Sequence, residues 1–336
     1  MGATPAFYSA EISMVKDDKL YVAGPDGSGL RCVAHLGELS ADSPGEPRVV
    51  WGPAADRLFV SGTVWNEPEP VALDSVDTAS AEWTRPTGTS VISITDGGDT
   101  LVKSPIGGGT MLDVSFLVRH DDVVYYPSGT HVAVVGENAR GEYGIFLATN
   151  RGADARQMVI TEMAELSSPA FDHFGLSLFW IARVDGVSHV HEIFARDDEE
   201  VVQVDLEGSI ILESERELSD LLVAPWVDGS PLIALTEGQC GDASGIRTLT
   251  QDWNPMPEEF QQFDNTPIGW LPDTHLVVAA YPGGCASGST DVYVVSWDNV
   301  GKPVAELFAA GVEGAAVRSP LPDPPPPPDA TFEGFA

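Results

Sequence analysis

Two histidines on one predicted strand have the spacing closest to that of a metal site. His189 and His191 are two positions apart within the run Ser188–Ala195, and alternate residues of a β-strand point to the same face of a sheet. A zinc site needs at least one further histidine, cysteine or carboxylate ligand, and none completes the set nearby. We therefore expect an ordinary sheet surface here and no metal ion.

The other candidate sites fit their motifs poorly. The acidic run Asp197–Glu200 could attract calcium, but it lacks the alternating oxygen ligands and the glycine of a calcium-binding loop, which favours a solvated turn. Ser93–Gly97 has the wrong spacing for the Asp-box of propeller sialidases. No GxSxG, HExxH or GxxxxGK[ST] motif is present. The sequence thus predicts no catalytic residue and no cofactor.

The stretch 120–159 shows which elements would position such residues. Its strand-like runs are rich in β-branched and aromatic residues, and Gly, Asn and Ser fill the gaps between them. This pattern predicts a four-stranded antiparallel meander of about 40 residues, the size of one propeller blade. The four predicted strands are Val123–Tyr126, His131–Val135, Gly144–Ala148 and Ala155–Val159.

Similar units recur along the chain, with first turns near residues 54, 97, 128, 173, 228 and 272. The N-terminal residues supply only three strands of a blade, and Glu313–Arg318 resembles a lone first strand. We expect this C-terminal strand to pair beside Ala10–Val15 and complete the first blade, which removes a free sheet edge. The prediction is an all-β propeller of seven blades, or six if the weakest unit, Thr89–Leu117, is misread. Ile210–Asp220 is predicted to be a helical or loop-like insertion.

The ends of the chain and its charge limit the classes of function. Residues 1–319 are expected to form one domain, and 320–336, with five consecutive prolines, a disordered tail.

A net charge of −34 disfavours binding to nucleic acid and to anionic membranes, and no apolar run is long enough to cross a bilayer. Met1–Leu20 lacks the pattern of a secretory signal, which predicts a cytoplasmic protein, or an exported mature form with an added Met.

Three cysteines show neither a CxxC motif nor metal-site spacing. Cys240 and Cys285 fall in the second-to-third-strand loops of consecutive predicted blades, and such loops emerge on one face. A disulfide between them is geometrically conceivable, and two free thiols are the preferred alternative. Cys32 falls within a predicted strand, where we expect it to be buried.

Several segments resemble the repeats of TolB-type, PD40-like propellers, which belong to the wider group of WD40-like repeats. Trp51–Val60 resembles the WSPDGKxIAF signature, with weaker copies at Tyr125–Gly129 and Leu271–Thr274. Gly144–Ala153 and Leu20–Gly27 are similar to the strand and turn IYVMDADGG. The resemblance implies a bacterial toroid that docks proteins or peptides, often outside the cytoplasm. It implies no catalytic residues, because the signature positions are structural.

The predicted topology places polar residues where the first strands begin, around the mouth of a central channel. Fixed negative charge at such a mouth would attract a cation or a basic peptide. We expect a non-enzymatic scaffold that docks a protein or peptide on this rim. The alternative is a propeller hydrolase or lyase that uses acidic channel residues. The predicted ligand-binding residues are Asp121, Asp122, Ser167, Ser219, Asp220, Asn265 and Glu313.

Overall fold

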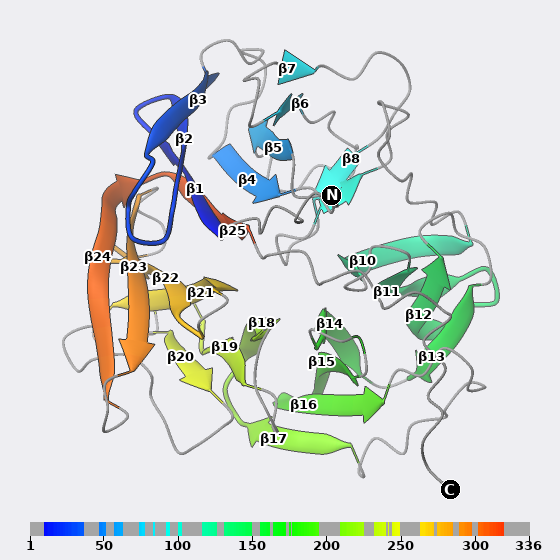
Figure 1. Cartoon of the computed structure of the whole chain (residues 1–336). Coiled ribbons are helices and arrows are strands. Elements are labelled where there is room, and N and C mark those ends of the chain that lie inside the picture. The colour runs from blue at the N-terminus through cyan, green and yellow to red at the C-terminus, as the bar shows by residue number, and fades with distance from the viewer. Residues whose placement is uncertain are drawn as a thin grey trace, which may run out of the picture.

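The chain forms a series of antiparallel β-sheets arranged in a circle (Figure 1). The computed structural model describes residues 10–36, 47–51, 57–62, 74–77, 83–84, 92–94, 100–102, 116–125, 131–149, 155–161, 164–172, 175, 177–194, 209–224, 232–239, 241, 244–248, 263–271, 274–284, 289–297 and 302–318. Within these ranges the regular elements are strands, β1 to β25, which form seven sheets. We number the sheets 1 to 7 in chain order.

Sheet 4 has the predicted meander, with strand order β10-β11-β12-β13. Its central strands are rich in buried valine, isoleucine and alanine, which suit a sheet covered on both faces. The turn between them is built by Asn138, whose Oδ1 accepts hydrogen bonds from the backbone of Arg140 and Glu142. The strands are β10 (Leu117–Tyr125), β11 (His131–Asn138), β12 (Tyr143–Thr149) and β13 (Arg156–Ile160).

The sheets after sheet 4 repeat this plan, although only three strands of sheet 6 are described. Sheet 5 consists of β14 (Glu165–Phe171), β15 (Ser177–Val184), β16 (Val187–Phe194) and β17 (Ile210–Ser214). Sheet 6 consists of β18 (Leu218–Val223), β19 (Ile233–Glu237) and β20 (Gly245–Thr248). Sheet 7 consists of β21 (Asp264–Trp270), β22 (Leu276–Tyr281), β23 (Thr290–Trp297) and β24 (Pro303–Val312).

The sheets before it follow the same order where they are described. Sheet 2 consists of β4 (Pro47–Trp51), β5 (Arg57–Gly62), β6 (Asp74–Asp77) and β7 (Trp83–Thr84). Sheet 3 consists of β8 (Ile92–Ile94) and β9 (Thr100–Val102). Only two strands of sheet 3 are described, so the choice between seven and six blades stays a prediction.

Sheet 1 joins the two ends of the chain. Its strand order is β25 (Gly314–Arg318), β1 (Glu11–Lys16), β2 (Lys19–Ala23) and β3 (Arg31–His35). β25 pairs antiparallel with β1, with Ala315 opposite Met14 and Val317 opposite Ile12. This is the pairing that the sequence predicted for the C-terminal strand.

The sequence-based prediction for Ile210–Asp220 is wrong, because this segment holds two strands. β17 pairs with β16, where Leu212 lies opposite Val190, and β18 opens the next sheet. Burial alternates along β17, with Leu212 more buried than the exposed Ile211 and Glu213, as an outer strand requires. The charges of Glu213–Glu217 suggest an exposed helix in isolation, but pairing with β16 decides the conformation.

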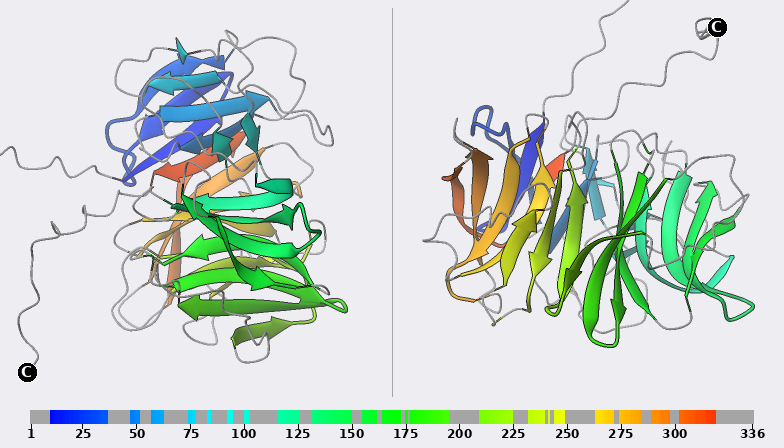
Figure 2. Two further views of the ribbon diagram at one scale, coloured as in Figure 1. Left: turned by 90° about the vertical axis from the view of Figure 1, so that its right-hand side faces the viewer. Right: turned by 90° about the horizontal axis from the view of Figure 1, so that it is seen from below.

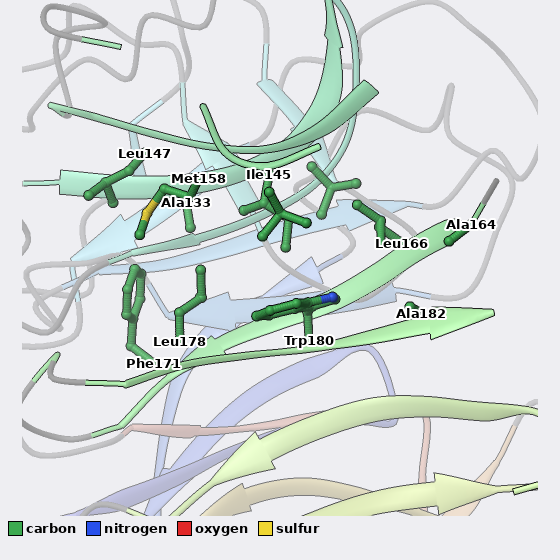
Figure 3. Close-up of a cluster of buried hydrophobic side chains, with 12 residues drawn as sticks. Ala133, Ile145, Leu147, Met158, Ala164, Leu166, Phe171, Leu178, Trp180 and Ala182 are labelled. Atoms are coloured by element: carbon green, nitrogen blue, oxygen red, sulfur yellow. The ribbon is translucent and has the colours of Figure 1, made fainter. Parts of the chain in front are cut away.

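Successive sheets pack face to face, and their apolar side chains interlock between them. Between sheets 4 and 5, Trp180, Leu178 and Phe171 face Ile145 and Ala133 (Figure 3). Equivalent clusters join sheets 1 and 2, 5 and 6, 6 and 7, and 7 and 1. The strands of neighbouring sheets therefore stand side by side when viewed from the edge of the disc (Figure 2).

One glycine sets how closely two sheets approach. A Cβ on Gly269 of β21 would lie 2.6 Å from Cβ of Val317 in β25, which is far inside van der Waals contact. The absence of a side chain lets the inner strands of sheets 7 and 1 meet.

The proline-rich tail and the expected absence of a membrane-spanning segment are two further predictions from the sequence. The proline-rich tail 320–336 lies outside the described residues. Of the part of the chain that is described, no helix has the length and apolar character needed to cross a membrane.

Candidate functional site: the rim where the inner strands begin

Strand register places the starts of the inner strands on one side of the disc. The first residues of β10, β14, β18 and β21 lie opposite the last residues of the second strands, as in Leu218 opposite Glu237 and Asp264 opposite Tyr281. The hairpins between second and third strands therefore lie on this side too, as the sequence predicted. We call this side the proximal rim and the opposite side the distal rim.

The inner strands also contact one another around the circle, in the order β10, β14, β18, β21, β25 and β4 (Figure 1). Five of the predicted site residues lie near the proximal ends of β14, β18 and β21 or directly before β25, whereas Asp121 and Asp122 lie in the middle of β10. The topology thus brings the seven residues to inner strands of the circle, although they span almost 200 positions of sequence, from Asp121 to Glu313.

Irregularities in the inner strands occur at the predicted site residues. The register shifts between His120 and Val123 in β10, between Ser167 and Ala170 in β14, and between Ser219 and Leu222 in β18. Such bulges redirect side chains relative to the regular alternation of a strand. Asp121, Asp122, Ser167, Ser219 and Asp220 lie within or beside them.

Asp122 and Asn265 are buried and serve the fold. Asp122 is 6% exposed, and its Oδ2 accepts a hydrogen bond of 2.9 Å from the backbone N–H of Ser168 in the next sheet. Ser168 has φ of 50°, an unusual conformation for a residue with a side chain, and this hydrogen bond helps hold it. Asn265 is 1% exposed and donates from Nδ2 to the carbonyl of Phe263 at 2.8 Å.

Asp121 belongs to a network of polar groups at the same place. Arg119 donates from Nε and Nη2 to its two carboxylate oxygens at 3.0 and 2.9 Å. The Tyr143 hydroxyl lies 3.3 Å from Asp121 Oδ2 and 3.4 Å from the carbonyl oxygen of Leu166. Burial, followed by the nearby charge of Asp121, raises the pKa of Tyr143 to about 12, so its hydroxyl stays protonated and donates.

The remaining predicted residues are half-buried at the rim. Ser219 Oγ donates to Asp220 Oδ2 at 2.8 Å, and both residues keep part of their surface in contact with solvent. Glu313 lies between β24 and β25, where its backbone N–H donates to the carbonyl of Val15 at 2.9 Å. Asp121, Ser167, Ser219, Asp220 and Glu313 are therefore the members of the set that retain solvent-exposed surface.

Asp264 is a buried carboxylate that sequence reasoning missed. Its two oxygens accept hydrogen bonds from the backbone N–H groups of Gly241 and Ser244 at 3.1 and 2.9 Å, and from Ser244 Oγ at 3.1 Å. It thereby fixes the hairpin between β19 and β20 on the proximal rim. Cys240 lies in that hairpin, but Cys240 and Cys285 are outside the described residues.

A second missed cluster joins sheets 5 and 6 at the proximal rim. Arg183 Nη1 lies 3.0 Å from Glu217 Oε2, which also accepts a hydrogen bond from Gln239. Ser214 Oγ donates to Glu237 Oε1 at 2.6 Å, and Arg247 Nη1 lies 3.0 Å from the same oxygen. The two ion pairs join residues 34 and 10 positions apart, so the sequence carried no signal that they pair.

The two histidines on β16 lie at the interface of sheets 4 and 5. His191 is 2% exposed, stacks on Trp180 with ring centroids 5.1 Å apart, and its Nδ1 lies 2.9 Å from Ser209 Oγ. Burial, followed by the charge of His189, lowers its pKa to about 4. The sheet face that carries His191 is therefore buried against sheet 4.

A carboxylate does approach the pair in space, because His189 Nδ1 lies 3.8 Å from Glu213 Oε2. Glu213 is on β17, the segment that sequence reasoning took for an insertion. Among the described residues, no group of three or more histidines, cysteines and carboxylates is arranged to hold a metal ion. Asp197–Glu200 lies outside those residues. Cys32 is exposed rather than buried.

Comparisons with known proteins support the fold. No known family and no curated protein matches the sequence. Among solved structures, TolB from Acinetobacter baumannii aligns with a TM-score of 0.50 and 14% identity, over 93% of this chain and 67% of that one. The resemblance to TolB-type β-propellers, first seen in the repeats, therefore holds for the fold.

Two other solved structures align less well. A chain of the nidogen/laminin complex has a TM-score of 0.45 and 9% identity, over 92% of this chain and 98% of that one. An oligogalacturonate lyase in complex with manganese has a TM-score of 0.44 and 12% identity, over 88% of this chain and 82% of that one.

Proposed function

We propose that this β-propeller is a non-enzymatic scaffold that docks a basic segment of a protein or peptide on its proximal rim. The proposal is supported by the half-buried carboxylates of Asp121, Asp220 and Glu313, which lie in or directly before inner strands of a chain whose net charge is −34. The inner strands that bear Asp121 and Asp220 belong to a series in mutual contact, and Glu313 directly precedes β25, another member of that series.

The electrostatics of such a rim favour a cationic ligand. Fixed charges of one sign raise the local concentration of the opposite sign and speed association. Asp121 is already paired with Arg119, so Asp220 and Glu313 would supply most of the attraction. Ser167 and Ser219 would add hydroxyl groups that can hydrogen-bond to a peptide backbone. Nucleic acid would be repelled by the same charges.

The rival proposal is a hydrolase or lyase that uses acidic residues at the channel mouth. General acid–base catalysis needs a titratable pair that can reach a substrate. The buried carboxylates of Asp122 and Asp264 instead accept backbone hydrogen bonds that hold hairpins and sheets together. His189 and His191 lie on a third strand, away from the inner strands. These contacts favour docking over catalysis.

The test uses a lysine-rich peptide as the probe and isothermal titration calorimetry as the measurement. The double variant Asp220→Asn/Glu313→Gln should weaken binding by about tenfold, which corresponds to ~1.4 kcal/mol. The matched control is Asp26→Asn/Asp172→Asn, which removes the same charge from turns on the distal rim. Equal weakening by both double variants would show non-specific attraction and would refute a docking site on the proximal rim.

A further inference from the structure

We propose a second interaction surface, separate from the proximal rim: the outer edge of β24, which adds an extended segment of another protein as a fifth strand of sheet 7. The incoming segment would alternate apolar and basic residues. A strand at the end of a sheet presents a row of backbone N–H and C=O groups that can pair with a further strand. Peptide recognition by such strand addition takes its affinity from the backbone and its specificity from alternate side chains.

The length of β24 sets it apart from the other outer strands. Among the strands that the structure describes, β24 is the last of sheet 7 and pairs only with β23, and it has ten residues. In the described part of the chain, the outer strands β3, β13 and β17 have five residues each, and β7 has two. A short outer strand protects a sheet from unwanted pairing, and β24 lacks that protection. Figure 1 shows it at the outer margin of the disc.

The side chains of β24 also leave apolar surface in solvent. Leu307 is 56% exposed and Val304 is 42% exposed, two of the five large apolar side chains exposed in the described residues. Ala305 and Phe308 pack in the two clusters that flank sheet 7, one on each face of the sheet. They thus anchor the strand, while Val304 and Leu307 keep exposed surface that a partner can contact.

The C-terminal end of β24 already makes hydrogen bonds to side chains of neighbouring strands. Lys16 Nζ donates to the carbonyl of Ala310 at 2.6 Å, and the Gly311 N–H donates to Asp291 Oδ1 at 2.9 Å. These bonds tie residues 310–311 to β1 and β23. The surface for strand addition is therefore Pro303–Ala309, whose register against β23 is regular as far as Leu307 and shifts before Ala309.

The charge of the chain selects the occupant. A second copy would bring two chains of net charge −34 together, which is unfavourable, whereas a basic segment is attracted. Glu306 is exposed between Val304 and Leu307, and a lysine or arginine on the added strand would pair with it across the strands. Residues of the segment on the Leu307 side would be apolar. This alternation is the chemistry that the edge recognises.

The test is binding of a short synthetic peptide in which valine and lysine alternate, measured by fluorescence anisotropy. Val304→Lys/Leu307→Lys adds repulsion at two exposed side chains without disturbing the core and should weaken binding about tenfold. The control Leu30→Lys/Ile211→Lys makes the same charge change at exposed apolar positions directly before β3 and within β17, and it should leave binding unchanged. An equal loss of peptide affinity in the two double variants would overturn the proposal.

Two further measurements separate strand addition from charge attraction and self-association. A peptide with a central proline keeps the charge but cannot pair as a strand, so it should not bind; equal binding would contradict strand addition. Hydrogen exchange with the peptide present should slow in 303–309, and protection confined to the proximal rim would contradict it too. Concentration-dependent dimers that Leu307→Lys dissociates would make a second copy the occupant instead. The rim variant Asp220→Asn/Glu313→Gln should bind this peptide normally, which distinguishes the two surfaces.

Discussion

The Arg318 guanidinium donates from Nη1 to Glu11 Oε2 at 2.8 Å, and this pair joins the last described strand to the first. Both side chains are largely buried, with exposed fractions of 9% and 12%. Arg318 also lies over the Trp51 ring of sheet 2, with Cζ 5.3 Å from the ring centroid. Strands β25 and β1 and the neighbouring sheet 2 therefore meet at the buried Arg318–Glu11 ion pair.

Arg318→Met should destabilise the protein by about 3 kcal/mol, because it leaves the Glu11 carboxylate buried without its main partner. Urea denaturation followed by circular dichroism measures the change. Arg31→Met is the control: it removes the other arginine on Glu11, whose side chain is 43% exposed, and should cost less than about 1 kcal/mol. Similar losses for both variants would mean that the buried pair does not secure β25.

Gly269→Ala should destabilise the junction between sheets 7 and 1 by about 1–3 kcal/mol, since its Cβ would overlap that of Val317. Gly245→Ala provides a matched control in a strand of sheet 6, because no atom lies within 4 Å of the added Cβ. That change should be neutral or slightly stabilising, as alanine has fewer conformations in the unfolded chain. If Gly269→Ala is also neutral, β21 and β25 do not approach as described.

Asp122→Ala should lower stability by about 1–3 kcal/mol, because the buried N–H of Ser168 loses its acceptor. Asp121→Ala breaks an ion pair whose Arg119 side chain is 61% exposed and should cost less than about 1 kcal/mol. Thermal melts of both variants in the same buffer give the comparison. The reverse order would show that Asp121, not Asp122, connects the sheets.

Stability should fall as the pH drops from about 6.5 towards 4, in part because of His191. Its pKa is lowered to about 4 in the folded protein, so the unfolded chain binds the proton more tightly over this range. The contribution of neutral His191 to the free energy of unfolding is fully present above pH 6.5. It falls by about 3 kcal/mol as the pH drops to 4. His191→Gln should flatten this slope relative to the wild type in urea titrations at pH 7, 6 and 5. If the pH dependence of stability is the same in His191→Gln and the wild type, groups other than His191 cause the loss.

The sequence favours two free thiols at Cys240 and Cys285 and leaves a disulfide between them conceivable, and mass spectrometry distinguishes the two states. If the disulfide forms, the mass of the unreduced protein after thiol alkylation should show one modified cysteine, Cys32, instead of three. Cys285→Ser should then leave two alkylated cysteines, Cys32 and Cys240, without reductant. Three modified cysteines in the unreduced wild type would establish free thiols.

The repeat was legible in the sequence because each blade carries its own local signals. Alternation of apolar runs with Gly, Asn and Pro turns marks four strands without reference to distant residues, as in 120–159. The pairing of β25 with β1 could be predicted as well, because the N-terminal unit lacked one strand and the C-terminal segment held one predicted strand without a blade of its own. These features depend on local patterns and on a count of strands.

Contacts between blades were decided by the tertiary structure alone. Ile210–Asp220 appeared as an insertion until pairing with β16 made Ile210–Ser214 the edge of sheet 5, and pairing with β19 made Leu218–Val223 the first strand of sheet 6. Asp122 appeared as a ligand residue until the β10 bulge turned its carboxylate towards Ser168. A sequence records which residues are polar, but the direction of a side chain at a bulge and its partner 46 positions away depend on how neighbouring sheets pack.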